Sequence, residues 1–250
     1  MTQIFLDNLN IPKTCAVNKT IFKKLFQENV VLDATDKKAL KDDIKKITWL
    51  FSLKSSNIGI AKYEDENFEY HEIAILQVNL SNKYRFKKIA NFINKAIPYP
   101  IILLFSFDNK FIINLTNKRI NKVDRSKLLI AEEFFTDELD SKNLNQAQKS
   151  FIYDCNIKNL SSLNLYEFYQ DLVARLISLN AASYSGIYNK TSTVKVLDCK
   201  KYLKQITDLE EEISSLQATL KKESQFNRQV DLNIKIKSKA NEIQKLKQNL

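Results

Sequence analysis

Glycine and proline are scarce in this sequence. Its 250 residues include two glycines, Gly59 and Gly186, and three prolines. Loops that cradle phosphates in Rossmann and P-loop proteins need several closely spaced glycines, because the backbone there approaches the phosphate without room for a side chain. Neither a G-x-G-x-x-G nor a G-x-x-x-x-G-K-[ST] motif is present, so nucleotide binding or hydrolysis by those loops is excluded.

Histidine and cysteine are too few for most metal-centred or triad chemistry. His71 is the single histidine, and Cys15, Cys155 and Cys199 lie far apart without a C-x-x-C pair. A structural zinc site takes about four nitrogen or sulfur ligands close together. We therefore expect no metal, no cofactor and no catalytic residue that the sequence identifies. Free thiols fit a reducing cytoplasm.

Long hydrophobic runs are also missing. The longest, IPYPIILLF, has about half of the roughly 20 residues that a membrane-spanning helix needs. The N-terminal segment MTQIFLDNLNIPK lacks a basic stretch followed by an apolar one, so it does not resemble a secretory signal. These absences predict a cytoplasmic protein without a membrane segment.

Charge, by contrast, is abundant and unevenly spread. The chain has a formal net charge of +10, and residues 83–127 hold eleven lysines and arginines against two aspartates. Clustered cations of this kind neutralise phosphates and release counterions, which gives salt-dependent binding with little sequence preference. The alternative is a solvated charged face without a partner. The nucleic-acid contact candidates are Arg85, Lys87, Lys88, Lys118, Arg119, Lys122, Arg125 and Lys127.

The hydrophobic periodicity predicts a mixed α/β (α+β) body over residues 1–190. Apolar residues at three- and four-residue steps predict helices at 18–30 and 35–54, and again at 162–186. Between them, residues 70–135 predict the order β-α-β-β-β. Its parts are a strand at 70–80, a helix from Asn82 to IPYP, a hairpin of strands 101–107 and 111–116, and a strand at 127–135.

A helical tail over residues 195–250 follows the body. Positions spaced as the a and d sites of a heptad predict a coiled-coil seam. The seam residues are Ile206, Leu209, Ile213, Leu216, Leu220, Asn227, Val230 and Ile234. Beyond Ile234 the apolar stripe shifts to Leu232, Ile236, Ile243, Leu246 and Leu250.

The stretch SQFNRQ leaves two arrangements open for this tail. It has no glycine or proline and the seam passes through Asn227, so we favour one continuous helix, about 75 Å long. A hairpin at SQFNRQ would equally explain the shift of the stripe. In the continuous helix, Asn227 would set the register of a dimer, and Phe226 and Arg228 beside it are candidate partner contacts.

An acidic segment raises the possibility of an enzyme. The stretch YEDENFEYHE (63–72) places several carboxylates, Glu69 and Glu72 among them, before a predicted strand. A metal-dependent nuclease needs carboxylates that converge on one or two divalent ions. However, the strand carries Gln77-Val78-Asn79 where restriction-type nucleases commonly have an acid-x-Lys pair. A nuclease is therefore the alternative to a non-catalytic protein.

Several stretches resemble one uncharacterised prokaryotic family, domain of unknown function 4391. They are YHEIAILQVNL, IANFINKAIPYPIILLF, NKRINKVDRSKLLIAEEFFTD, LYEFYQDLVARLISLNAA and LKKESQFNRQVDLNIKIK, in this order between residues 20 and 237. The resemblance implies no activity. It implies a context near helicases and DNA methyltransferases in restriction-like, phage-defence gene clusters.

Together these observations predict a non-catalytic accessory subunit of a DNA-processing defence or restriction assembly. The basic segment would bind nucleic acid, and the tail would hold a helicase, a DNA methyltransferase or a second copy of the chain. A pure protein adaptor without nucleic-acid contact is a further alternative.

Overall fold

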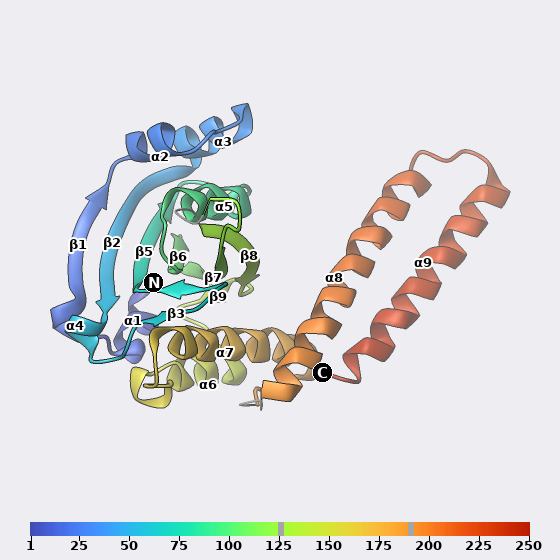
Figure 1. Ribbon diagram of the computed structural model, residues 1–250. Helices are drawn as coiled ribbons and strands as arrows, with labels where there is room; N and C mark the ends of the chain where they lie inside the picture. Colours follow the sequence, from blue (N-terminus) through green and yellow to red (C-terminus); the bar gives the residue numbers. More distant parts are fainter. Residues whose placement is uncertain (125–127, 190–192) are drawn as a thin grey trace. The chain divides into compact units, whose positions relative to one another are not determined.

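The computed structural model describes residues 1–124, 128–189 and 193–250 and divides the chain into two units (Figure 1). The first unit spans Met1–Leu176 and the second Ile177–Leu250. Each unit is described by itself below. The boundary falls inside helix α7 (Leu165–Ser185), which begins in the first unit and ends in the second.

A seven-stranded mixed sheet forms the centre of the first unit, as far as the described residues go. Its strand order is β1-β2-β5-β6-β7-β8, and the short β9 also pairs with β7. The strands are β1 (Ala16–Ile21), β2 (Ile44–Lys54), β5 (Glu72–Leu80), β6 (Ile101–Phe107), β7 (Lys110–Ile120), β8 (Leu128–Phe135) and β9 (Leu139–Asp140). A separate two-stranded sheet consists of β3 (Tyr63–Glu64) and β4 (Glu69–Tyr70).

The chain crosses from β5 to the parallel β6 through helix α5 (Phe86–Ala96), and all other pairs in the sheet are antiparallel. This confirms the predicted β-α-β-β-β order and the mixed α+β class. The other helices of the unit are α1 (Gln3–Leu9), α2 (Lys23–Asn29), α3 (Ala34–Lys38), α4 (Ser55–Ile58) and α6 (Gln146–Asp154), with short turns η1 (Lys13–Cys15), η2 (Ala39–Asp43) and η3 (Ile157–Asn159).

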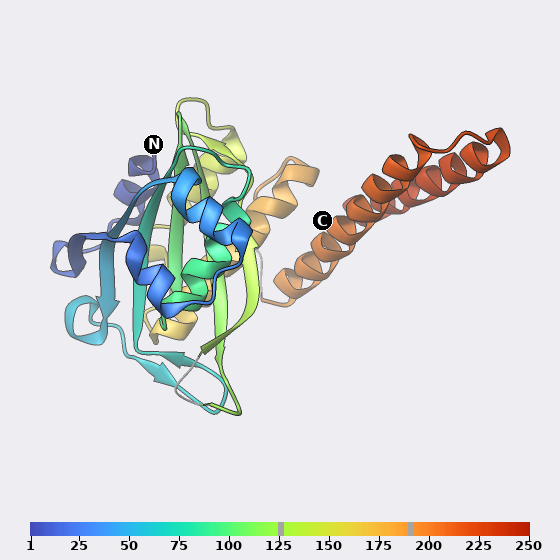
Figure 2. The same ribbon diagram turned by 90° about the horizontal axis from the view of Figure 1, so that it is seen from above.

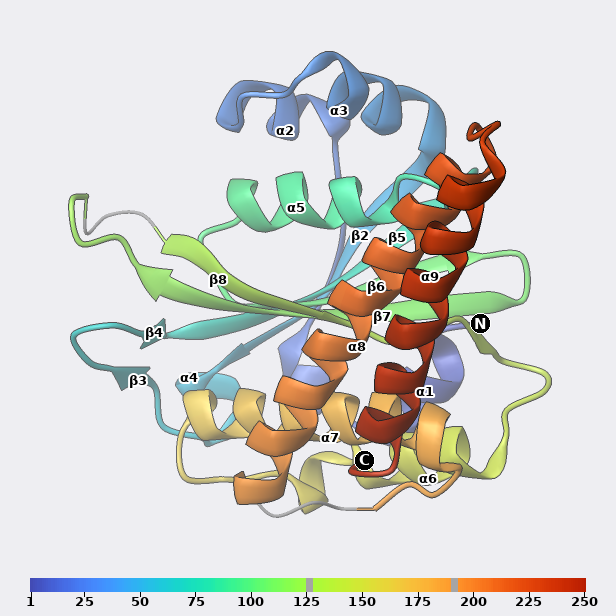
Figure 3. The same ribbon diagram turned by 90° about the vertical axis from the view of Figure 1, so that its right-hand side faces the viewer.

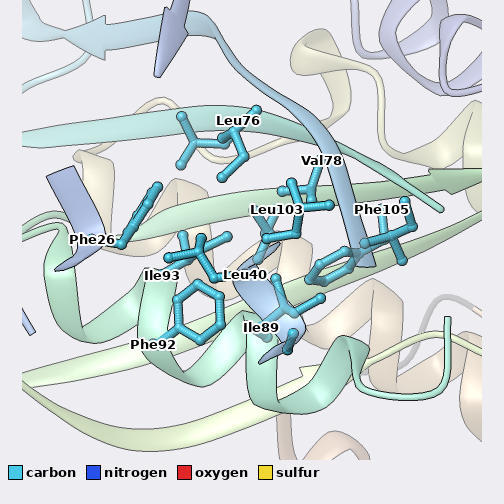
Figure 4. Packing of buried hydrophobic residues seen from close by; sticks show 14 of the residues in the cluster. Phe26, Leu40, Leu76, Val78, Ile89, Phe92, Ile93, Leu103 and Phe105 are labelled. Atoms are coloured by element: carbon cyan, nitrogen blue, oxygen red, sulfur yellow. The ribbon is translucent and has the colours of Figure 1, made fainter. Parts of the chain in front are cut away.

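Helices cover both faces of the sheet (Figure 3). Helix α5, with α2 and α3 beside it, packs on one face through a cluster that includes Phe26, Leu76, Leu103 and Phe105, all fully buried (Figure 4). On the other face, Phe5 of α1 stacks on Phe151 of α6. The first part of α7 lies there too, where its buried Tyr169 hydroxyl donates a hydrogen bond to the Ile101 carbonyl, 2.7 Å away.

The two helices predicted before residue 55 are partly wrong. Residues 16–21 form a strand and the helix starts only at Lys23, because the segment pairs along β2 and so completes the sheet. The second predicted helix ends in a π-helical turn at Asp43, and residues 44–54 are strand β2. Two register irregularities in β2 give its apolar residues three- and four-residue spacings that also fit a helix.

The second unit contains a helical hairpin, with α8 (Thr193–Leu220) and α9 (Phe226–Lys247) running antiparallel side by side (Figure 2). The continuous helix that we favoured is therefore wrong. Glu223 makes the turn without a glycine: its Oε1 accepts hydrogen bonds from the backbone N–H groups of Ser224 and Gln225, both at 2.9 Å. Its carbonyl accepts a third from Gln229 Nε2 at 2.7 Å.

The predicted seam divides between two sides of this hairpin. Ile206 and Leu209 of α8 are buried against Ile243 of α9. Ile213, Leu216 and Leu220 are half-buried. The α9 residues of the predicted seam lie on the outside instead, with Val230 39% and Ile234 61% exposed and Asn227 also exposed. The shifted stripe, which includes Leu232 and Ile236, supplies the buried side of α9 because reversal of the chain changes the facing residues.

All three cysteines are free and buried. Burial raises the pKa of each thiol above its ordinary value. In the described part of the chain, every helix is too short or too polar to cross a membrane.

Candidate nucleic-acid interface

Helix α5 positions three of the predicted phosphate contacts. Its apolar residues recur at three- and four-residue steps, so Ile89 and Ile93 face the sheet and the charged residues face outward. IPYP after its last turn ends the helix, since the residue before a proline disfavours helical geometry. Arg85, Lys87 and Lys88 consequently lie together around the amino-terminal turn of α5.

Arg85 is committed to a neighbouring carboxylate. Its Nε and terminal nitrogen donate to both carboxylate oxygens of Asp43, at 2.5 and 2.7 Å. Asp43 is buried, and its hydrogen bonds raise the pKa of Arg85 above the ordinary value. A bidentate pair of this kind is geometrically specific. Arg85 therefore anchors α5 to the turn before β2. Because Asp43 neutralises its charge, Arg85 is a poor candidate for a phosphate contact.

Lys87 and Lys88 are better placed. Both are exposed on α5. The Lys87 ammonium lies 6.0 Å from the centre of the Phe135 ring, a weak cation–π contact. Lys88 forms an exposed ion pair with Asp33, at 3.4 Å. The pKa of Asp33 is lowered mainly by the backbone N–H of Asp36, with Lys88 contributing. Exposed pairs of this type contribute about 0–1 kcal/mol, so a phosphate can displace the carboxylate.

Lys118 must be removed from the candidate contacts. It is 1% exposed, and its ammonium donates to the carbonyls of Ile97 and Tyr99 at 2.6 Å each. Burial lowers the pKa of Lys118 to about 7, opposed by the charge of Glu133. Lys118 thus holds the carbonyl end of α5 and the loop after it, and cannot reach a phosphate from this position.

Two of the remaining predicted contacts lie in a different element from α5. Arg119, near the end of β7, and Lys122, just after it, are exposed. Arg125 and Lys127 lie outside the described residues. The described cations of segment 83–127 are therefore distributed over separate elements, α5 and the end of β7.

Sequence reasoning missed lysines that the fold places beside α5. Helices α2 and α3 contact α5. Helices α2, α3 and α5 with the turn η2, which we call the basic layer, contain eight lysines and four acidic residues, a net charge of +4. Lys37, Lys38 and Lys41 of this layer are exposed and form no ion pair with the described residues. Their segment was predicted as an ordinary amphipathic helix, whose polar face gave no specific signal.

The carboxyl ends of β5 and β6 border an open pocket of about 520 Å³. Lys45, Lys83, Lys110 and the 87% exposed Tyr84 line it, together with Asp108 and Asp140. Glu138 pairs with both Lys83 and Lys110, and its pKa is lowered by them. Opposite charges thus balance along this edge, whereas the basic layer has an excess of positive charge.

The acidic segment 63–72 does not gather its carboxylates at one point. Glu72 is buried and accepts a hydrogen bond from Ser52 at 2.6 Å and pairs with Lys54 at 3.1 Å. Glu64 and Glu69 instead contact the two ring nitrogens of His71, at 3.0 and 3.2 Å. Among the residues described, no three histidine, cysteine or acidic side chains are grouped so that they could hold a metal ion.

A comparison with known families finds one match. The model described as "Domain of unknown function (DUF4391)" matches residues 9–243. Searches of curated proteins and of solved structures find no match.

Proposed function

The chain belongs to the DUF4391 family of domains of unknown function, and on that premise we propose a non-catalytic, nucleic-acid-binding accessory subunit for it. It acts in the cytoplasm, within a DNA-processing assembly of the phage-defence or restriction type. The basic layer contacts phosphates, and the C-terminal hairpin contacts a helicase, a DNA methyltransferase or a second copy of the chain. The assembly context rests on the family resemblance alone.

One observation carries the nucleic-acid part of the proposal. Helices α2, α3 and α5 with the turn η2 carry a net charge of +4, and Lys37, Lys38 and Lys41 have no carboxylate partner among the described residues. Unpaired exposed lysines attract phosphates without first breaking an internal contact. No such group of unpaired cations is needed for the packing of α5, which rests on apolar contacts and on Arg85.

A salt series tests this directly. Fluorescence anisotropy with a labelled 20-mer duplex should give a dissociation constant that rises steeply between 50 and 200 mM salt, by about 10-fold or more. Replacing Lys37, Lys38 and Lys87 with glutamine should flatten the plot of log K against log salt by about 2–3 units, since each phosphate contact contributes close to one.

The matched control replaces three exposed lysines elsewhere in the first unit, Lys142, Lys149 and Lys158, with glutamine. The net charge changes equally in both variants. If the control weakens binding as much as the basic-layer variant, the layer is not the site. If the wild-type chain does not bind even at low salt, the nucleic-acid proposal fails and a pure protein adaptor becomes the better description.

The protein-binding part of the proposal concerns the outside of the hairpin. We propose that α8 and α9 form an antiparallel coiled coil, in which the inner apolar residues of each helix pack against those of the other. A partner must then use the outer side, where Phe226 is 74% and Ile234 61% exposed. Capture of a helicase or methyltransferase expressed from the same gene cluster should be lost on Phe226→Ser with Ile234→Ser. It should persist with Arg228→Ser, because Arg228 already lies near Glu223, at 3.9 Å.

We do not propose the nuclease. Of its candidate carboxylates, Glu72 is engaged by Ser52 and Lys54, and Glu64 and Glu69 by His71, as described above. Cleavage of plasmid in Mg²⁺ or Mn²⁺ that disappears on Glu69→Ala or Glu72→Ala would reinstate it.

A further inference from the structure

A band of polar side chains crosses four neighbouring strands of an otherwise apolar sheet. The register aligns Thr20 with Thr48, and Thr48 with Gln77. One step along the strands, it aligns Lys46 with Asn79, and Asn79 with Ser106. We call these six residues the sheet platform. With strands about 4.8 Å apart, the platform spans roughly 14 Å, enough for one or two nucleotides.

The sheet platform lies on the face away from α5. Successive side chains of a strand point to opposite faces, and Leu76 and Val78 belong to the cluster under α5. Gln77 and Asn79 therefore point to the other face. Lys46 and Thr20 are exposed there, Thr48, Gln77 and Asn79 are half-buried, and Ser106 is buried. Solvent thus reaches most of the platform.

Hydrogen bonds within the platform fix the orientation of its two amides. Gln77 Nε2 donates to Asn79 Oδ1 at 2.9 Å and to Ser106 Oγ at 3.3 Å. Ser106 Oγ in turn donates to Asn79 Oδ1 at 2.8 Å. The network uses the donor end of Gln77 and the acceptor end of Asn79.

The other ends of the two amides take no part in this network. Gln77 Oε1 and Asn79 Nδ2 have no hydrogen-bond partner among the described residues, and neither is one of the buried unsatisfied atoms. Gln77 and Asn79 lie two residues apart on one face of β5, so this face offers one free acceptor and one free donor, the kinds of group that hydrogen-bond to the edge of a nucleobase. The Watson–Crick edge of every base carries a donor next to an acceptor, and this edge is free in a single strand.

An exposed aromatic ring stands beside the platform. Phe22 is 76% exposed and has an extended backbone. Phe22 directly follows Ile21, the last paired residue of β1, and its extended backbone continues the alternation, so its side chain points to the face that carries Thr20. An exposed ring next to a lysine is the combination on which unpaired bases stack while their phosphates meet the cation.

We infer that the sheet platform binds single-stranded nucleic acid by reading a base. The base stacks on Phe22, its edge meets Gln77 Oε1 and Asn79 Nδ2, and its phosphate meets Lys46. A duplex cannot use this site, because its bases are stacked and their pairing edges are occupied. The inference rests on the proposed function and adds to it the class of nucleic acid that is recognised.

The experiment measures anisotropy of labelled 12-mers, single-stranded poly-dA, poly-dC and poly-dT and one duplex, at one salt concentration. Wild type should bind the preferred single strand about 10-fold or more tightly than the duplex. Phe22→Leu should weaken single-strand binding roughly 5- to 50-fold and duplex binding less than about 2-fold. Asn79→Leu with Gln77→Met should weaken binding of all three single strands by roughly 5-fold or more and leave duplex binding nearly unchanged, because the contacts with the base edge are lost.

The control is Tyr153→Leu, which removes another aromatic residue, 74% exposed, from α6. Thermal melts confirm that each variant is folded. Equal loss with Tyr153→Leu, or equal loss of single-strand and duplex binding with Phe22→Leu, overturns the inference while leaving phosphate binding by the basic layer intact. A chain that binds neither single strand nor duplex overturns both.

Discussion

The two units of this protein differ in the apolar core that stabilises each of them. The sheet of the first unit buries a cluster in which Leu76, Leu103 and Phe105 have no exposed surface. The hairpin of the second unit buries three apolar residues in its cluster, Ile206, Leu209 and Ile243, with others half-covered around them. Burial contributes about 25 cal/mol per Å² of apolar area, so the first unit has far more stabilisation per element.

This difference suits the two units to different tasks: the sheet holds recognition residues in fixed positions, and the hairpin can change its conformation on binding a partner. A rigid sheet holds Lys46, Gln77 and Asn79 at fixed spacings, as a recognition surface requires. A two-helix hairpin with a thin seam opens at lower free energy than a sheet core and can adjust to a partner. Four predictions test this comparison, from the largest expected effect to the smallest.

Leu103→Ala should destabilise the chain most, by about 3–5 kcal/mol, because it leaves a cavity in the cluster under α5. Urea unfolding followed by the fluorescence of Trp49, the single tryptophan, measures it. Val31→Ala, at a site 99% exposed, should change stability by less than about 0.5 kcal/mol. A loss below about 1 kcal/mol at Leu103 would mean that the core is not the rigid part.

Lys118→Met tests the contribution of the buried lysine in the first unit, whose interior is otherwise mainly apolar. Below pH 7 the ammonium is protonated in the folded and the unfolded chain, so its burial cost is fully present. Between pH 7 and 10 the unfolded chain keeps a proton that the folded chain loses, so wild type gains stability relative to the variant, by about 2–4 kcal/mol. Unfolding at several pH values measures the difference. A difference that stays constant from pH 7 to 10 contradicts the lowered pKa.

Ile243→Ala should open the hairpin, with a local loss of about 1–3 kcal/mol. Hydrogen exchange should accelerate in α8 and α9 and remain unchanged in β5 and β6 at low denaturant. Faster exchange in the sheet as well would show that the two units unfold together. It would contradict the conclusion that the hairpin opens independently of the sheet.

Ile234→Ala and Asn227→Ile should have the smallest effects, within about 0.5 kcal/mol, since both positions are exposed on the outer side of α9. If α8 and α9 instead formed one continuous helix in a dimer, Asn227→Ile would raise the melting temperature and change the oligomer distribution. Thermal melts with light scattering distinguish the two arrangements.

Local patterns were sufficient to predict the β-α-β-β-β part of the fold. IPYP ends α5, and DNK separates two apolar strands, so chemistry within a few residues determines those boundaries. Strand β2 could not be predicted in this way, because its irregular pairing with β5 reproduces the spacing of a helix. The turn at Glu223 was missed for a related reason: a side chain supplies the hydrogen bonds for which glycine is the usual signal.

The candidate site was predicted only in part. Lys87 and Lys88 are exposed on α5, as the helical periodicity indicated. Lys118 is not, because strand β7 continues to Ile120, beyond its predicted end at residue 116, and takes Lys118 into the interior. The lysines of α3 gather beside α5 only through tertiary packing, and no pattern along the chain indicates that proximity.

The buried cysteines have a practical consequence for measuring the opening of the hairpin. Thiolates, not thiols, react with maleimides, and the raised pKa values of Cys15, Cys155 and Cys199 keep them protonated near neutral pH. A single cysteine introduced at Ser224, exposed in the hairpin turn, would therefore take a spin label or fluorophore selectively. The native chain is in this sense already prepared for spectroscopy, without removal of its own thiols.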